Sequence, residues 1–257
     1  MKVDIQRQVA VVTNAAKGIG KAVAKVLLEN GATVFIADVS DGDGERTARE
    51  LSALGTCRYV HADVTRANEV DSLVNIVRDE CGRIDIMVNN AGINAGVDGV
   101  TVDHIADKDW DRLIAVNLGG AFYCCRAISR VMIEQRAGRI INIGSVLGSI
   151  PARKQIAFMA ANAGSQNMTK ALALELGTFG ICVNGVAVGP IAVDGSQGDD
   201  KTSPMAQMLS HVPLSRFGTV EEVANAILFL CGKESGYITG HIMTVDGGWT
   251  CGYHRDF

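Results

Sequence analysis

The sequence has no run of about 18 apolar residues, so it offers no candidate for a transmembrane helix. The apolar core that a signal peptide needs is also missing from its first residues, and we therefore expect a cytoplasmic protein. Lysine and arginine are scattered along the chain, and the formal net charge is −4. This distribution argues against a basic surface for nucleic acid.

Metal-binding and disulfide patterns are missing as well. The seven cysteines include no C-x-x-C pair, and the five histidines include no H-x-x-x-H pair. We therefore expect neither a metal site nor a disulfide framework, and we interpret most cysteines as buried small apolar residues. Nearly half of the residues are hydrophobic, which is enough to bury a large core.

Short apolar runs do alternate with longer amphipathic segments. The runs are rich in valine and isoleucine, which is typical of strands buried on both faces of a parallel sheet. The predicted strands are 8–13, 33–38, 57–63, 84–92, 138–145, 181–188 and 241–248. The predicted helices are 18–30, 43–54, 67–81, 108–135, 155–178 and 219–232, two of them with threonine caps at Thr65 and Thr219. This alternation predicts an α/β fold with helices on both faces of the sheet.

A glycine-rich turn follows the first predicted strand, in "VVTNAAKGIGKAVAKVLLENG". Gly18 and Gly20 would let the backbone approach a pyrophosphate at the start of a helix, although such glycines also simply close tight turns. Asp38 ends the second strand, where a carboxylate can accept hydrogen bonds from the ribose hydroxyls of an adenosine. Its alternative role is to cap the following helix. The strand-helix-strand context favours a dinucleotide site over both alternatives.

Several ordered motifs together resemble the short-chain dehydrogenase/reductase family, from about residue 5 to residue 248. The motifs are "TNAAKGIG", "HADVT", "NNAG" at 89–92, "VNLGG" with Asn117, "INIGS" with Ser145, and "TVDGGW". The resemblance implies a Rossmann-like, doubly wound, seven-stranded parallel sheet forming one dinucleotide-binding domain over residues 1–257. We expect a loop or lid at about 191–210 and a C-terminal tail at 249–257. The resemblance also implies a homodimer or homotetramer built through helices 108–135 and 155–178.

The family's cofactor-binding positions can be carried over onto this sequence. They are Asn14, Lys17, Gly18, Ile19, Gly20, Asp38, Val39, Asp63, Val64, Asn90, Ala91, Gly92, Asn162, Gly189 and Ile191. In the family, a carboxylate such as Asp38 implies NAD rather than NADP, because it would repel a 2′-phosphate. Lys17 favours the opposite choice, since NADP users often carry a basic residue there. We give the carboxylate more weight and expect NAD.

The family's catalytic pair is absent. Its Tyr-x-x-x-Lys motif places a proton donor and an ammonium on one face of a helix, and here those two positions hold Phe158 and Asn162. Ser145 and Asn117 remain as the catalytic residues implied by the resemblance. Val188 and Val193 replace a proline and a threonine near the expected nicotinamide site. We therefore expect an intact adenosine end and weaker binding at the nicotinamide end.

Three functional hypotheses remain open. The first is an NAD-dependent oxidoreductase with impaired or unusual chemistry, in which Lys154 or His254 could substitute for the missing groups. The second is a non-redox enzyme on the same scaffold, such as an isomerase, lyase, dehalogenase or cyclase. The third is a catalytically inactive subunit or nucleotide sensor. The sequence does not identify a small-molecule substrate.

Overall fold

Seven parallel strands form the central sheet of the computed structural model, which describes residues 2–90, 92–93, 99–193 and 208–252. Their order across the sheet is β3 (Cys57–His61), β2 (Thr33–Asp38), β1 (Val9–Thr13), β4 (Ile86–Asn89), β5 (Gly138–Ser145), β6 (Ile181–Val188) and β9 (Ile242–Val245). All six neighbouring pairs are parallel. The predicted doubly wound α/β fold is confirmed.

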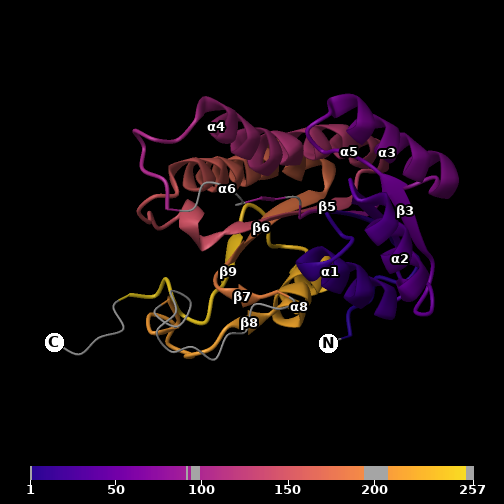
Figure 1. The fold of residues 1–257 in the computed structure, drawn as a ribbon. Coiled ribbons are helices and arrows are strands. Elements are labelled where there is room, and N and C mark those ends of the chain that lie inside the picture. The colour runs from indigo at the N-terminus through magenta and orange to yellow at the C-terminus, as the bar shows by residue number, and fades with distance from the viewer. Residues whose placement is uncertain (1, 91, 94–98, 194–207, 253–257) are drawn as a thin grey trace.

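Helices cover both faces of this sheet (Figure 1). One layer contains α1 (Gly18–Glu29), α2 (Asp41–Leu51) and α8 (Val220–Cys231). The other contains α3 (Ala67–Cys81), α4 (Asp107–Ile114), α5 (Ala121–Gln135) and α6 (Ile156–Leu176). Each layer buries its own apolar cluster against the sheet.

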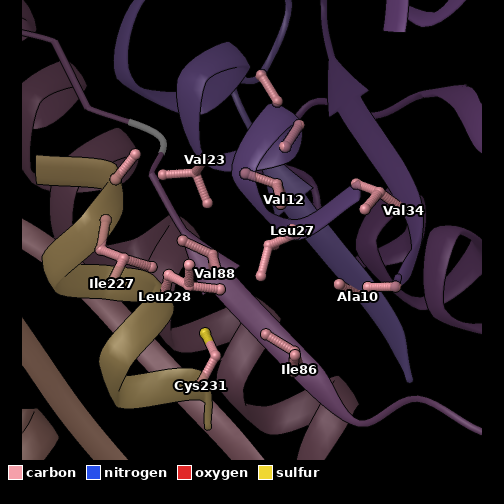
Figure 2. Packing of buried hydrophobic residues seen from close by; sticks show 14 of the residues in the cluster. Ala10, Val12, Val23, Leu27, Val34, Ile86, Val88, Ile227, Leu228 and Cys231 are labelled. Carbon is pink, nitrogen blue, oxygen red and sulfur yellow. The ribbon is translucent and has the colours of Figure 1, made fainter. Parts of the chain in front are cut away.

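The buried strand β1 shows why both faces need a helical layer. Ala10 and Val12 pack into the cluster on the α1 and α8 side, whereas Val9 and Val11 pack into the cluster on the other side (Figure 2). Successive side chains of a strand point to opposite faces, so a continuous apolar run must be covered twice. This explains why the strands could be predicted from uninterrupted valine and isoleucine runs.

Two local features differ from the prediction. The helix expected over 108–135 is α4 and α5 joined by a π-helical segment, Ala115–Gly120. The structure also has a short parallel pair, β7 (Ile191–Ala192) with β8 (Gly218–Thr219), that the sequence analysis did not predict. Three 3₁₀ turns complete the described elements: Val146–Gly148, Gly177–Phe179 and Lys233–Ser235.

One of the two predicted threonine caps is confirmed. Thr219 begins α8 with a capping box, in which its hydroxyl accepts from the Glu222 amide at 3.2 Å. The Glu222 carboxylate accepts from the Thr219 amide at 2.9 Å. The cap predicted at Thr65 is wrong, because Arg66 is the N-cap residue of α3. The Thr65 hydroxyl instead donates to the Asp63 carboxylate at 2.7 Å, so it serves the preceding loop.

The expectation that most cysteines are buried is wrong, because three of the seven are buried, three are partly exposed and one is exposed. Cys124, Cys125 and Cys231 are buried, and Cys251 is exposed. Burial raises the pKa of Cys125 and of Cys231 to about 12, so these thiols stay protonated near neutral pH.

None of the helices in the described ranges has both the length and the apolar character needed to cross a bilayer.

Candidate functional site

The candidate site lies where the strand order reverses. Strand β1 pairs with β2 on one side and with β4 on the other, and the chain winds outward from this point in both directions. In open parallel sheets, ligands bind in the crevice beyond the carboxyl ends of such strands. The predicted residues lie at this edge of the sheet: Gly18 begins α1 after β1, Asp38 ends β2, and Asn90 directly follows β4.

The loop between β1 and α1 has the geometry of an anion site. Asn14 and Gly18 adopt left-handed conformations, with φ of 49° and 58°. A Cβ on Gly20 would lie 2.5 Å from the Asn14 carbonyl oxygen and 2.6 Å from Asn90 Nδ2, so only glycine fits there. Asn90 Nδ2 donates to that same carbonyl at 2.9 Å. The loop is thereby held against β4.

The start of α1 adds favourable electrostatics. Lys17 is its N-cap residue, its side chain makes no capping bond, and the first turn, which includes Ile19, carries no acidic residue. The first amides of a helix lack intrahelical partners and attract anions. This end of α1 can therefore accept a phosphate or pyrophosphate group.

Asp38 lies beside this turn with only 7% of its surface exposed. Its Oδ2 accepts from the Ala16 amide and its Oδ1 accepts from the Ser40 amide, both at 3.1 Å. A carboxylate has about four lone-pair positions, so acceptor capacity remains for a ligand. The two backbone bonds hold the carboxylate in one orientation. Asp38 can thus act as a fixed acceptor for ribose hydroxyls.

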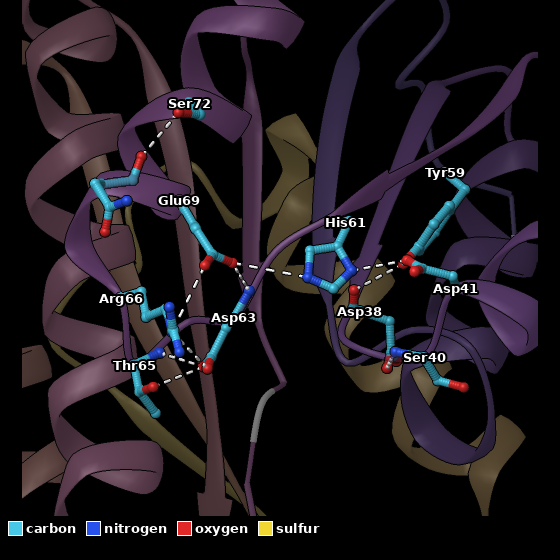
Figure 3. A network of polar contacts seen from close by, with 11 residues as sticks. Asp38, Ser40, Asp41, Tyr59, His61, Asp63, Thr65, Arg66, Glu69 and Ser72 are labelled. Atoms are coloured by element: carbon cyan, nitrogen blue, oxygen red, sulfur yellow. Dashed lines mark hydrogen bonds and ion pairs between the residues drawn. The ribbon is translucent and has the colours of Figure 1, made fainter.

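Asp63 is fixed on the neighbouring strand end. Its carboxylate accepts from the Thr65 amide at 2.9 Å and the Thr65 hydroxyl at 2.7 Å, and its own amide donates to Glu69 at 2.9 Å (Figure 3). Partial burial alone would raise the pKa of Asp63, but the Thr65 bonds and the Arg66 charge lower it overall. Asp63 is therefore ionised near neutral pH.

A cavity of about 390 Å³ opens between these groups, within the size range of small-molecule sites. Val39 beside it is 60% exposed, which leaves an apolar surface for a ligand to cover. The cavity is lined by Asn14, Asp38, Val39, Ala62, Asp63, Val64, Thr65, Gly92, Ile93, Arg112 and Val116. An adenosine would find a carboxylate acceptor and apolar walls in this space.

Some of these lining residues escaped the sequence analysis. Thr65 belongs to the "HADVT" motif and could have been inferred from its position after Asp63. Arg112 lies in α4 and Val116 four residues later in the π-helical segment, and that spacing places them on one face of the continuous helix. No motif marks them, because the face of α4 that meets the cavity depends on tertiary packing.

A polar network supports the cavity from outside. The Tyr59 hydroxyl donates to the Asp38 carbonyl at 2.9 Å and to Asp41 at 2.7 Å (Figure 3). His61 Nδ1 lies 2.7 Å from the same Asp41 oxygen, and its Nε2 lies 3.8 Å from Glu69. The Tyr59 hydrogen bond, followed by the His61 bond, lowers the pKa of Asp41. This network joins the ends of β2 and β3 to α2 and α3.

Ser145 and Asn117 lie at the other end of the crevice. Ser145 ends β5, and its hydroxyl accepts from the Leu147 amide at 3.2 Å. Asn117 lies in the π-helical segment and exchanges two 2.8 Å hydrogen bonds with the backbone of Ile93. Asn117 therefore fixes the chain just after the "NNAG" motif.

Both ends of the Asn162 side-chain amide are hydrogen-bonded to the protein backbone. Its Oδ1 accepts from the Ser145 amide at 2.8 Å, and its Nδ2 donates to the Phe158 carbonyl at 2.8 Å. Only 5% of Asn162 is exposed. A Cβ on Gly144 would lie 2.9 Å from its Oδ1, so this close approach uses a glycine. One turn further along α6, Gln166 donates to the Ser145 carbonyl at 3.0 Å.

Phe158 faces an apolar surrounding. It packs against the cluster of buried Leu113 and Ala157, against which the partly buried Ile93 and Ile105 also pack. A benzyl side chain has no proton to transfer and no hydrogen-bonding group. At this position the site therefore offers an apolar wall.

The chain after β6 also borders the crevice. Val193 Cγ1 would lie 3.4 Å from a Cβ on Gly18, so a methyl group faces the start of α1. A Cβ on Gly189 would collide with Asp246 at 2.6 Å, which explains the glycine at that position. Ile191 begins β7 and is half-buried.

Of the two proposed substitutes for the missing pair, Lys154 lies in the part of the chain that the structure describes. Lys154 is exposed in the segment before α6 and has a left-handed backbone, with φ of 65°. His254 and Ala91 lie outside the described residues, as do 194–207 of the expected lid and 253–257 of the tail.

A second cavity, of about 500 Å³, opens beside Ile191 near the end of β9. Its charged side chains already have partners within the protein. Arg216 forms two hydrogen bonds to Glu222, at 2.9 and 2.6 Å. Asp246 accepts from the amides of Gly248 and Thr250 at 2.9 and 2.8 Å. These contacts are structural, so we assign the cavity no chemistry.

Comparison with known proteins gives a consistent result. A family described as "Enoyl-(Acyl carrier protein) reductase" matches residues 14–250. The chain is 38% identical to the 3-oxoacyl-[acyl-carrier-protein] reductase FabG of Vibrio harveyi, over 95% of this chain and 98% of the relative. It is equally identical, 38%, to tropinone reductase-like 2 of Erythroxylum coca, over 96% and 91%. Equal identity to two differently named reductases does not single out a substrate.

A solved structure supports the same relationship. The structure of a short-chain type dehydrogenase/reductase from Mycobacterium ulcerans superposes with a TM-score of 0.92 at 27% identity. The match covers 100% of this chain and 94% of the other.

The bond between Asn162 and Ser145 makes a testable contribution to stability. Asn162→Ala would leave the Ser145 amide without its acceptor, and we expect a loss of about 1–3 kcal/mol in the free energy of unfolding. Asn167→Ala is the matched control, because Asn167 is exposed on the same helix, and it should change stability by less than about 0.5 kcal/mol. Urea denaturation measures both. Equal effects would contradict the assigned role of Asn162.

Proposed function

The chain belongs to the short-chain dehydrogenase/reductase family, and from this premise we propose that it binds NAD(H) but transfers hydride poorly. The observation that carries the proposal is the contrast between the two ends of the crevice. The adenosine end has a cavity, a fixed Asp38 carboxylate and an open helix start. At the other end, Phe158 has no proton to donate and Asn162 is bonded to the backbone.

The preference for NAD rests on the charge around the ribose position. Asp38 lines the cavity, and a ligand carrying a 2′-phosphate would bring like charges together. Lys17 would favour the phosphate, but its charge also acts on the Asp43 carboxylate. The Arg46 and Ser40 hydrogen bonds lower the pKa of Asp43, and the Lys17 charge adds to that effect, so Lys17 is already near a carboxylate. This arrangement supports NAD.

The third hypothesis, nucleotide binding without chemistry, gains support from the same contacts. Ser145 accepts a backbone hydrogen bond and is not paired with a general acid at Phe158. Losing a general acid typically lowers the rate by about 10²–10⁴. The lysine position acts through the tyrosine, so losing both does not double the cost. A weak reductase and a protein that only binds the nucleotide therefore differ in how much of the reaction rate remains.

Titration of the purified protein with NADH and NADPH tests the cofactor choice. We expect NADH to bind at least about tenfold more tightly, because of the repulsion between Asp38 and the 2′-phosphate. Asp38→Asn should shift this ratio toward NADPH. The control is Asp79→Asn, which removes an exposed carboxylate that neither lines the cavity nor joins the Tyr59 network, and it should change the ratio less than about threefold. Equal affinities in the unmodified protein would refute the NAD preference.

Restoring the catalytic pair tests the proposed chemical defect. We expect Phe158→Tyr combined with Asn162→Lys to raise NADH-dependent reduction of a 3-oxoacyl thioester by about 10²–10⁴. The substrate is chosen because several relatives are named 3-oxoacyl-[acyl-carrier-protein] reductases. Phe158→Tyr alone should gain less, since no ammonium would lower the phenol pKa.

Either of two results would count against this defect. The unmodified protein could already turn over at the rate of the double variant. Alternatively, the double variant could fold and bind NADH yet gain no activity on the thioester or on a panel of ketones. The second result would favour a site remodelled for non-redox chemistry.

We also propose a homodimer or homotetramer assembled through α5 and α6. Phe122 on α5 is 43% exposed and Leu174 on α6 is 84% exposed, in the same helical layer. Exposed apolar groups of this kind mark contact surfaces when they lie together.

Light scattering should give two or four times 27.2 kDa, and Leu174→Glu should lower that mass. Val102→Glu, at a 69% exposed position away from both helices, should not. A monomeric unmodified protein would refute the assembly.

A further inference from the structure

We propose that the site recognises the ADP half of its ligand and is insensitive to the redox state of the nicotinamide. This inference rests on the proposed nucleotide binding. It predicts that NAD⁺, NADH and ADP-ribose bind with similar affinity. The ligand class is therefore any nucleotide with an unmodified ADP-ribosyl group, whether or not it carries a nicotinamide.

The groups that can hold an adenosine diphosphate are built into the strand ends. Asp38 is fixed by two backbone amides, and Asp63 is fixed by two hydrogen bonds from Thr65. The exposed Val39 side chain and Val64 supply apolar walls to the cavity. All of these hydrogen bonds join groups of the protein to one another. The ADP half would therefore meet a preorganised site, which lowers the entropic cost of binding.

At the lysine position of the family, in contrast, no side chain is available to bind the nicotinamide half of the ligand. Recognition of the nicotinamide ribose there needs a long cationic side chain that reaches into the crevice. Asn162 is short, uncharged and 5% exposed, and both ends of its amide are bonded to backbone atoms. Rotating the amide toward a ligand would break the bond to the Ser145 amide. An interaction that replaces an equivalent one adds little affinity.

Two further side chains, Phe158 and Val193, cannot make hydrogen bonds to a ligand. The Phe158 ring lies in an apolar cluster and offers no hydrogen bond to a ligand. Val193 places a methyl group near the start of α1 where the family expects a hydroxyl. The remaining contacts at these positions are non-directional, so they do not distinguish a charged nicotinamide from a neutral dihydronicotinamide.

The two halves of the ligand are thus read by separate parts of the chain. Asp38 and Asp63 lie at the ends of β2 and just beyond β3, whereas Asn162 and Phe158 belong to α6. The bonds that hold one set share no residue with the bonds that hold the other. A protein with this site would respond to the pool of ADP-ribosyl nucleotides rather than to its oxidation state.

Isothermal titration with four nucleotides tests the inference on the unmodified protein. We expect the dissociation constants of NAD⁺, NADH and ADP-ribose to agree within about threefold. Reduced nicotinamide mononucleotide, which lacks the adenosine monophosphate half, should bind at least about 100-fold more weakly. Asp38→Asn should weaken the first three ligands by the same factor, because each uses the same carboxylate.

A variant with the family's pair restored provides the matched comparison. In Phe158→Tyr combined with Asn162→Lys, an ammonium could bond the nicotinamide ribose. A hydrogen bond to a charged group should make NADH bind about tenfold or more tightly than ADP-ribose. This gain would show that the assay detects nicotinamide recognition when it exists.

The outcomes separate this inference from the function on which it rests. If NADH binds the unmodified protein at least tenfold more tightly than ADP-ribose, the inference is wrong and the NAD site stands. The same conclusion follows if reduced nicotinamide mononucleotide binds as well as NADH. If none of the adenosine ligands binds at millimolar concentration, both the inference and the proposed nucleotide binding fail.

Discussion

The site depends on the reversal of strand order between β1 and β4. Because both strands are parallel, their carboxyl ends emerge side by side, and their loops must share the same crevice. The bond from Asn90 to the Asn14 carbonyl ties these loops together, and Gly20 makes room for it. The start of α1 is thereby directed at the crevice. A larger residue in place of Gly20 would separate the loop between β1 and α1 from β4 and open the end of the crevice proposed to bind phosphate.

A second constraint acts on the opposite side of the crevice. Helix α6 is attached to the end of β5 at both backbone groups of one residue, since the Ser145 amide donates to Asn162 and the Ser145 carbonyl accepts from Gln166. In this chain the residue at the lysine position is therefore part of the helix-to-sheet packing. A side chain that serves packing cannot also reach for a ligand. On the proposed assignment of position 162 to the lysine of the family, an amide that holds the end of β5 stands where an ammonium would bind the ligand.

The sequence predicted the sheet, its helices and the position of Asp38, because burial on both faces and a phosphate turn leave local patterns. It failed where tertiary contacts decide. Thr65 and Thr219 occupy similar sequence contexts, yet only Thr219 caps a helix, since the hydroxyl of Thr65 bonds Asp63. The π-helical segment and the β7–β8 pair have no local pattern either. The bond from the Ser145 amide to Asn162 could not be predicted, because it depends on how closely α6 packs against β5.

The chemistry of the pair explains why both members can be absent together. A lysine at position 162 would lower the pKa of a tyrosine at position 158, so its catalytic benefit disappears once the phenol is gone. An unpaired ammonium in so buried a position would then cost desolvation energy without any compensating role. An amide bonded to two backbone atoms avoids that cost. Asp38 and Asp63 are held by different strands and loops, so nothing in these contacts requires them to change when positions 158 and 162 do.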